Sequence, residues 1–292
     1  FTNSKAPTTN LDEAREYAKE KFALAVTDFS EREKKCISFV VDKINGILLE
    51  NDLGLMAYQP WRFIKVEDWL CGGFAHTRGT YIILSQRHID HLSKTWNNNM
   101  TAEEVRTLLE NMGALLVHEQ MHSLQRTFKS KFEILYTEYW SFTKADVLND
   151  STIRNNQVSN PDAPIAEWLI ANPKDAKSFY WVRTLLKETE GIPVMGKDFT
   201  DRVFVVKKIN GKYSPIKSED GNLIYTNLDG IDFYKNAFPI SRGIDHPNEI
   251  SAYMFSDYFE SLISNTNPFQ ETDRKSLKIS DLFIEWIKKE MK

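Results

Sequence analysis

The residues best suited to chemistry in this chain are His118, Glu119 and His122, which lie within a single pentapeptide. On an α-helix, residues four apart lie on the same face, about one turn apart. Two imidazoles placed in this way can bind one zinc ion, and the Glu between them can accept a proton from a water molecule at the metal. We therefore expect a single Zn²⁺ held by His118 and His122, with Glu119 as the general base of a metal-assisted hydrolysis.

The segment that precedes the motif has the pattern of an amphipathic helix. Thr101 and Glu104 match the capping box that starts many helices. Apolar residues then recur every three or four positions, and continuing their phase brings the motif to the buried side. These apolar residues are Val105, Leu108, Leu109, Met112, Leu115 and Leu116. The metal-binding groups are therefore expected at the edge of a core.

A catalytic zinc ion usually has three protein ligands, so a third one has to be found. A metzincin would have Gly three residues after His122 and His six residues after it, but the chain has Gln125 and Phe128 there. A carboxylate from a later helix is the remaining common solution. Two candidates stay open: Glu249, near the start of a helix marked by a Pro, and Glu138, within an aromatic run.

Glu249 is favoured by a resemblance. The stretch Glu249-x-x-Ala252 followed by Tyr258-Phe259 resembles the second metal-binding helix of the gluzincin metallopeptidases, and His246 to Ile250 is similar to the opening of that helix in bacterial zinc proteins. The resemblance implies an α+β, zincin-like fold, a peptidase activity and Glu249 as third ligand. It departs from thermolysin at Tyr253, where thermolysin has an Asp that orients the first His.

Two further side chains near Glu249 are candidates for catalysis. His246 is expected either to donate a hydrogen bond to a substrate oxyanion or to cap its helix. Tyr253 lies one turn after Glu249 and is expected either to point at the metal or to pack in the core. Arg242 is a third candidate for stabilising the oxyanion.

The rest of the pattern predicts an α+β protein in two parts. Residues 1–130 are expected to hold helices capped by Asn10 and Ser30, a small sheet and the zinc helix, with Tyr81 to Ser85 as the edge strand packed on that helix. Residues 131–292 are expected to be mainly helical, including Pro173 to Thr189. A β-hairpin insertion is expected near 191–232, around Asn210-Gly211.

The overall composition and charge of the chain argue against some classes of binding partner. The net charge of −4 and the absence of a long basic run argue against nucleic-acid binding, and no apolar stretch is long enough to span a membrane. The chain begins with Phe1 instead of Met, which fits either removal of a signal peptide or trimming of the sequence, and we expect an extracytoplasmic or secreted protein. We expect a peptide or protein substrate. The alternatives are a zinc hydrolase of a non-peptide substrate and a non-catalytic zinc-binding protein.

Overall fold

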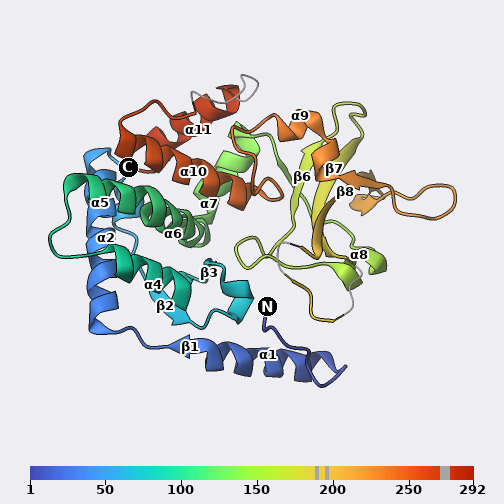
Figure 1. Cartoon of the computed structure of the whole chain (residues 1–292). Helices are drawn as coiled ribbons and strands as arrows, with labels where there is room; N and C mark the ends of the chain where they lie inside the picture. Colours follow the sequence, from blue (N-terminus) through green and yellow to red (C-terminus); the bar gives the residue numbers. More distant parts are fainter. Residues whose placement is uncertain (188–190, 195–196, 270–276) are drawn as a thin grey trace. The chain divides into compact units, whose positions relative to one another are not determined.

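The computed structural model describes residues 1–187, 191–194, 197–269 and 277–292 (Figure 1). Contacts divide the chain into two units, each with its own sheet. Unit 1 consists mainly of residues 1–127 and 255–266, and unit 2 mainly of residues 128–187, 198–254 and 277–292. The long helix α10 (Pro247–Ser264) therefore contributes its first half to unit 2 and its second half to unit 1. The fold is mixed α and β, as predicted.

The helices of unit 1 begin at the polar residues that the sequence marked as caps. Asn10 Oδ1 accepts hydrogen bonds from the first turn of α1, and Ser30 and Thr101 each form a complete capping box, with Glu33 and Glu104 respectively. Its helices are α1 (Leu11–Ala25), α2 (Glu31–Glu50), α3 (Gly54–Ala57), η1 (Leu70–Gly73), α4 (Gln86–Thr95), α5 (Ala102–Leu108), the π turn η2 (Leu109–Gly113) and α6 (Ala114–Thr127).

The sheet of unit 1 has the strand order β1-β2-β4-β3. The strands are β1 (Val26–Thr27), β2 (Phe63–Val66), β3 (His76–Arg78) and β4 (Tyr81–Ser85). The prediction that β4 is the edge strand is wrong, because β4 pairs with β2 on one side and β3 on the other. The edge strands are β1 and β3, and the polar residues of β3 lack the apolar alternation that marked β2 and β4. Both β3 and β4 pack against α6.

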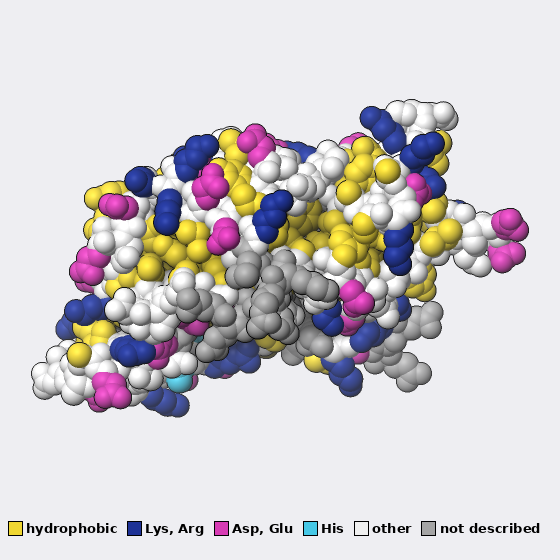
Figure 2. Space-filling model, turned by 90° about the horizontal axis from the view of Figure 1, so that it is seen from above, with side chains coloured by type: hydrophobic (Ala, Val, Ile, Leu, Met, Phe, Trp, Pro, Cys, Tyr) yellow, Lys and Arg dark blue, Asp and Glu magenta, His cyan; other side chains and the backbone are white. Residues whose placement is uncertain are grey.

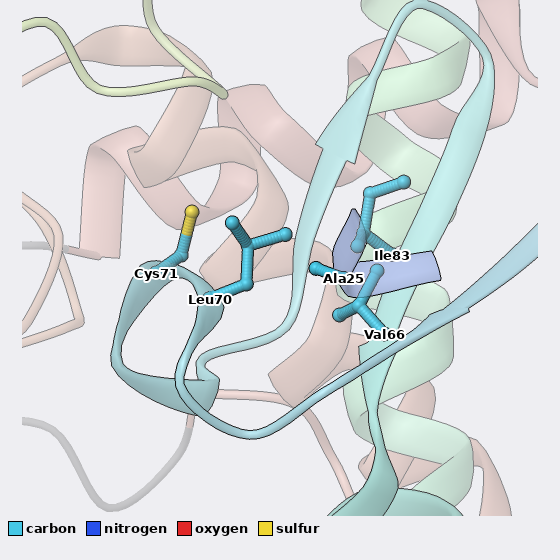
Figure 3. Packing of buried hydrophobic residues seen from close by; sticks show 5 residues of the cluster. All are labelled: Ala25, Val66, Leu70, Cys71 and Ile83. Carbon is cyan, nitrogen blue, oxygen red and sulfur yellow. The ribbon is translucent and has the colours of Figure 1, made fainter. Parts of the chain in front are cut away.

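Small apolar side chains fill the space beside this sheet. Ala25, Val66 and Ile83 come from the end of α1 and from neighbouring strands, and Leu70 and Cys71 come from the adjoining turn (Figure 3). All five are buried. This cluster is one of the contacts that fix the sheet against which α6 packs.

Unit 2 is built around a six-stranded antiparallel sheet, so the prediction of a mainly helical second part is wrong. Its central strand, β7, spans Ser178–Leu186, where a helix was expected. Aromatic and β-branched residues dominate this segment and favour a strand over a helix. The other strands are β5 (Thr143–Lys144), β6 (Trp168–Ala171), β8 (Phe199–Ile209), β9 (Lys212–Pro215) and β10 (Tyr225–Asn227).

The hairpin predicted at Asn210-Gly211 is confirmed. Ile209 at the end of β8 pairs with Lys212 at the start of β9, and Asn210 and Gly211 both have positive φ, as a tight two-residue hairpin turn requires. Residues 195–196 of the predicted 191–232 insertion lie outside the described residues. The helices that complete unit 2 are α7 (Lys129–Ile134), the π turn η3 (Leu135–Tyr139), α8 (Ser151–Asn156), η4 (Leu228–Gly230), α9 (Asp232–Lys235) and α11 (Leu277–Glu290).

The surface drawn in Figure 2 carries Lys and Arg side chains interspersed with Asp and Glu. This mixture agrees with the small net charge and gives no continuous basic face on the part shown. Among the described residues, no helix combines the length and the apolar character that crossing a membrane requires.

Candidate metal centre

Three buried side chains of α6 form the first half of the site. His118, Glu119 and His122 are all buried, and His122 is fully so. The predicted continuous helix is interrupted by the π turn η2, after which α6 runs without a break through the motif. The π turn shifts the register by one residue, and such turns are frequent near functional sites.

The two imidazoles converge on one point. The Nε2 atoms of His118 and His122 lie 3.2 Å apart. Two nitrogens that bind one zinc ion tetrahedrally at about 2.05 Å are about 3.3 Å from each other. The same spacing accommodates one N–H···N hydrogen bond when no ion is bound. The pair therefore fits zinc without rearrangement.

Gln125 fixes the orientation of the second imidazole. Its side-chain oxygen Oε1 lies 2.9 Å from Nδ1 of His122. Because this oxygen can only accept, Nδ1 carries the proton and Nε2 keeps its lone pair for a metal. In the sequence, Gln125 served only to exclude a metzincin, although its three-residue distance from His122 on a helix could have revealed this contact.

Glu119 is held by a threonine on the edge strand β3. The hydroxyl of Thr77 lies 2.8 Å from a carboxylate oxygen of Glu119 and 2.9 Å from its main-chain oxygen, and it donates to both. Thr77 is fully buried. The hydrogen bond fixes the orientation of the Glu119 carboxylate, as a general base requires.

Glu249 lies on the first turns of α10 and is held within unit 2. It is buried, and Asn160 donates a hydrogen bond of 2.8 Å to its Oε1. Asn248, the preceding residue, donates to the main-chain oxygen of Asp162. The loop 160–162 thus fixes the start of the helix and the carboxylate of Glu249. Nothing in the sequence near Glu249 indicated Asn160.

Within unit 1, the second half of α10 packs beside η2 and the start of α6. Ser256 donates to the main-chain oxygen of Ala114, and Phe259 lies against Gly113.

His118, His122 and Glu249 form a group of buried side chains that could hold a metal ion, with one ligand atom of each within 4.8 Å of the others. Glu119, His122 and Asp162 form a second such group. The first set has the His₂Glu composition typical of catalytic zinc. The second set contains only one His and uses Glu119, which in an HExxH helix is suited to the role of base and not of ligand. We therefore take the first set as the candidate metal centre.

The rival ligand Glu138 lies on η3 and is exposed. It belongs to neither of the two groups of possible ligands found among the described residues. The difference in burial follows from the aromatic run, whose rings occupy the core while the carboxylate stays in water.

His246 caps α10. Its Nδ1 accepts the main-chain N–H of Asn248, which leaves the ring proton on Nε2, 3.0 Å from the main-chain oxygen of Ile165. Both ring nitrogens are therefore engaged within unit 2, and of the two roles open from sequence the structure shows capping. The other role would require breaking the bond to Ile165.

Tyr253 is half-buried one turn after Glu249, under the loop that contains Arg242 and Gly243. The guanidinium of Arg242 lies 4.8 Å from the centre of the Tyr253 ring. A Cβ at Gly243, which has φ +62°, would come within 2.3 Å of that ring. Glycine is required here by both the close approach and the backbone conformation.

The residue two positions before α10 is a buried carboxyl group. Burial, together with the charges of Glu249 and Asp201, raises the pKa of Asp245 to about 8. At neutral pH Asp245 is therefore mostly protonated and adds little negative charge near Glu249.

Comparisons with protein-family models, with curated proteins and with solved structures found no match to this chain.

Proposed function

We propose that the chain is a zinc-dependent metallopeptidase with a zincin-like arrangement of its two metal-binding helices. The observation that carries the proposal is the convergence of the His118 and His122 Nε2 atoms at 3.2 Å, with the Glu119 carboxylate fixed beside them. A solely structural zinc site has no need for a carboxylate poised as a base.

Each residue has a part in the reaction. His118, His122 and Glu249 would hold the ion, and Gln125 and Asn160 orient two of these ligands. When bound, zinc supplies Lewis-acid polarisation of the substrate carbonyl and acidifies water at the site. Glu119 accepts the proton of the attacking water and returns it to the leaving nitrogen. Thr77 keeps the Glu119 carboxylate in place for both transfers.

The edge strand β3 is the natural position for an extended substrate. It carries Thr77, and its outer side has no strand partner among the described residues. A peptide that pairs with β3 would run past the strand that holds the general base. This arrangement favours a peptide over a compact acyl substrate.

The proposal is tested by metal analysis and by cleavage of a peptide library. Protein purified without added metal is analysed by mass spectrometry, and hydrolysis is measured with and without a chelator. We expect one zinc ion per chain, loss of hydrolysis with chelator and recovery with added zinc. Glu119→Gln should retain zinc and lose at least about 10²-fold in rate, because the amide cannot accept the proton.

Three results would contradict the proposal. Protein that contains no zinc and takes up none would place the chemistry elsewhere. Zinc binding without cleavage of any peptide would favour a hydrolase of another substrate or a zinc-binding protein. Near-normal rates in Glu119→Gln would remove the general base.

A further inference from the structure

Unit 2 contains a cavity apart from the residues of the candidate metal centre. Its volume is about 560 Å³, and it lies between the strand β7 and the segments 144–149 and 164–167. This volume is within the range of small-molecule sites. Val147, Pro164 and Ile165 form an apolar part of its lining, and Trp181 and Arg183 on β7 form another part.

Arg183 is the unusual residue of this lining. Its Nε atom is buried and has no hydrogen-bond partner, and its Nη2 donates to Gln157 at 2.8 Å. The guanidinium lies 5.1 Å from the centre of the Trp181 ring, two residues earlier on the same face of β7. Burial lowers the pKa of Arg183. An arginine in this condition is destabilised until an anion binds it.

The charges around Arg183 do not compensate it. Glu167 also lines the cavity but is bound by Lys144, and Asp146 is exposed. Within the described part of the chain, no acidic side chain forms an ion pair with Arg183. In the register of β7 and β8, Arg202 lies directly opposite Arg183, and residues so placed share one face of the sheet. Arg202 itself lies outside the cavity lining, where its guanidinium contacts Asn227 and the ring of Tyr225.

We propose that this cavity binds an organic carboxylate, with Arg183 as the residue that pairs with it. The Nη–H groups of Arg183 that are not bonded to Gln157 can donate to the two oxygens of a carboxylate. The apolar walls contact the hydrocarbon part of the ligand. The carboxylate comes from a small free acid or from an acidic side chain of a peptide. The site does not depend on the metal centre or on peptidase activity.

The test is calorimetric titration of the full chain in the Glu119→Gln background, which prevents cleavage of peptide probes. The probes are 3-phenylpropionate and a short acetylated, amidated peptide with one Glu, each paired with its uncharged amide. We expect at least one acid to bind with a Kd at or below about 1 mM, and its amide at least about tenfold more weakly. The probe that binds shows whether the carboxylate belongs to a small free acid or to an acidic side chain of a peptide.

Arg183→Met should weaken binding of the acid at least about tenfold, because the charge-assisted pair is lost. Arg202→Met is the matched control: it removes the same charge from the opposite position on β8, outside the lining, and should cost less than about threefold. If Arg183→Met does not fold, the comparison of acid with amide on the parent protein still shows whether the cavity recognises a carboxylate.

Four outcomes would overturn the proposal. These are no binding of either acid at 10 mM in the assay, equal binding of acid and amide, unchanged binding in Arg183→Met, and binding of inorganic phosphate without binding of either acid.

Discussion

One hydroxyl group, that of Thr77, holds the proposed general base. Replacing Thr77 by Val keeps its shape and removes the donor, so the Glu119 carboxylate should lose its fixed position. We expect Thr77→Val to lower kcat about tenfold with little change in KM, while Thr77→Ser restores most of the rate. Zinc content, measured in parallel, should stay at the level of the parent protein.

A rate in Thr77→Val equal to that of the parent would show that Glu119 is positioned by other contacts. Loss of zinc together with rate would show that Thr77 supports the fold of the site and not the base. The serine variant separates these explanations, because it retains the donor but not the methyl group.

Glu249 and Glu138 can be compared by zinc titration of the apo variants. Glu249 is buried and oriented by Asn160, whereas Glu138 is exposed. Glu249→Ala should therefore weaken zinc binding by orders of magnitude, and Glu138→Ala should leave it close to that of the parent protein. The opposite result would reverse the assignment of the third ligand.

The members of the candidate metal group could be proposed from sequence. His118 and His122 are one helical turn apart, and Glu249 was indicated by its resemblance to a known metal-binding helix. Their supporting residues could not be found in this way. Thr77 is 42 residues from Glu119 and Asn160 is 89 from Glu249, so only the fold brings each pair together.

At the scale of elements, a buried ion pair links helix α2 to strand β2. Lys65 Nζ lies 3.1 Å from Glu33, and the side chains are 8% and 11% exposed. Burial alone would raise the pKa of Glu33, but hydrogen bonds from Ser30 and Lys65 outweigh it and the pKa is lowered. Because the pKa of Glu33 is lower in the folded state than in the unfolded state, ionised Glu33 stabilises the fold at pH values above the unfolded-state pKa, near 4.5. This stabilisation is lost as the pH falls through the lower pKa of the folded state.

Lys65→Met should therefore reduce the free energy of unfolding by about 2 to 3 kcal/mol at pH 7, because it leaves Glu33 buried without its partner. The difference from the parent should shrink as Glu33 becomes protonated below about pH 4. Urea unfolding of both proteins at pH 7 and at a pH below about 4 measures this difference in stability. Lys34→Met, which removes an exposed pair with Glu31, is the control and should change stability little. A loss that is the same at both pH values would contradict this account.

The elements that were predicted correctly carry strong local signals. Capping boxes mark α2 and α5, and Asn210-Gly211 marks the hairpin of β8 and β9. The strand β3 was missed because it has three polar or charged residues and is stabilised by pairing with β4. The strand β7 was taken for a helix because its long apolar run fits both patterns, and its pairing with β6 and β8 decides between them.

For the whole molecule, zinc should act as a ligand of the folded state. Apo protein, prepared with a chelator, should unfold at a lower temperature than protein with zinc, by mass action. At a free zinc concentration 100 times the Kd, the free energy of unfolding should rise by about 2.7 kcal/mol. Scanning calorimetry of the parent and of His122→Ala measures it. A zinc-induced rise in Tm that persists in His122→Ala would place the binding site elsewhere.

The division into two units could be predicted only in outline. Local patterns indicate helices and strands, but they do not show that one helix belongs to both units. The sheet of unit 2 depends on pairings between distant strands, such as β10 with β8, which no local pattern contains. The cavity beside Arg183 arises from this sheet and from the segments that cover it, and was not predicted.

The placement of α10 also has a consequence for how the protein is made. Gly113 and Ala114 contact Phe259 and Ser256, which leave the ribosome only after nearly all of unit 2 has been synthesised. At usual rates of translation this delay is on the order of ten seconds. During that time α6 lacks the helix that covers it, and His118 and His122 lack Glu249. A metal held by all three residues of the candidate group could therefore bind only after translation has passed α10.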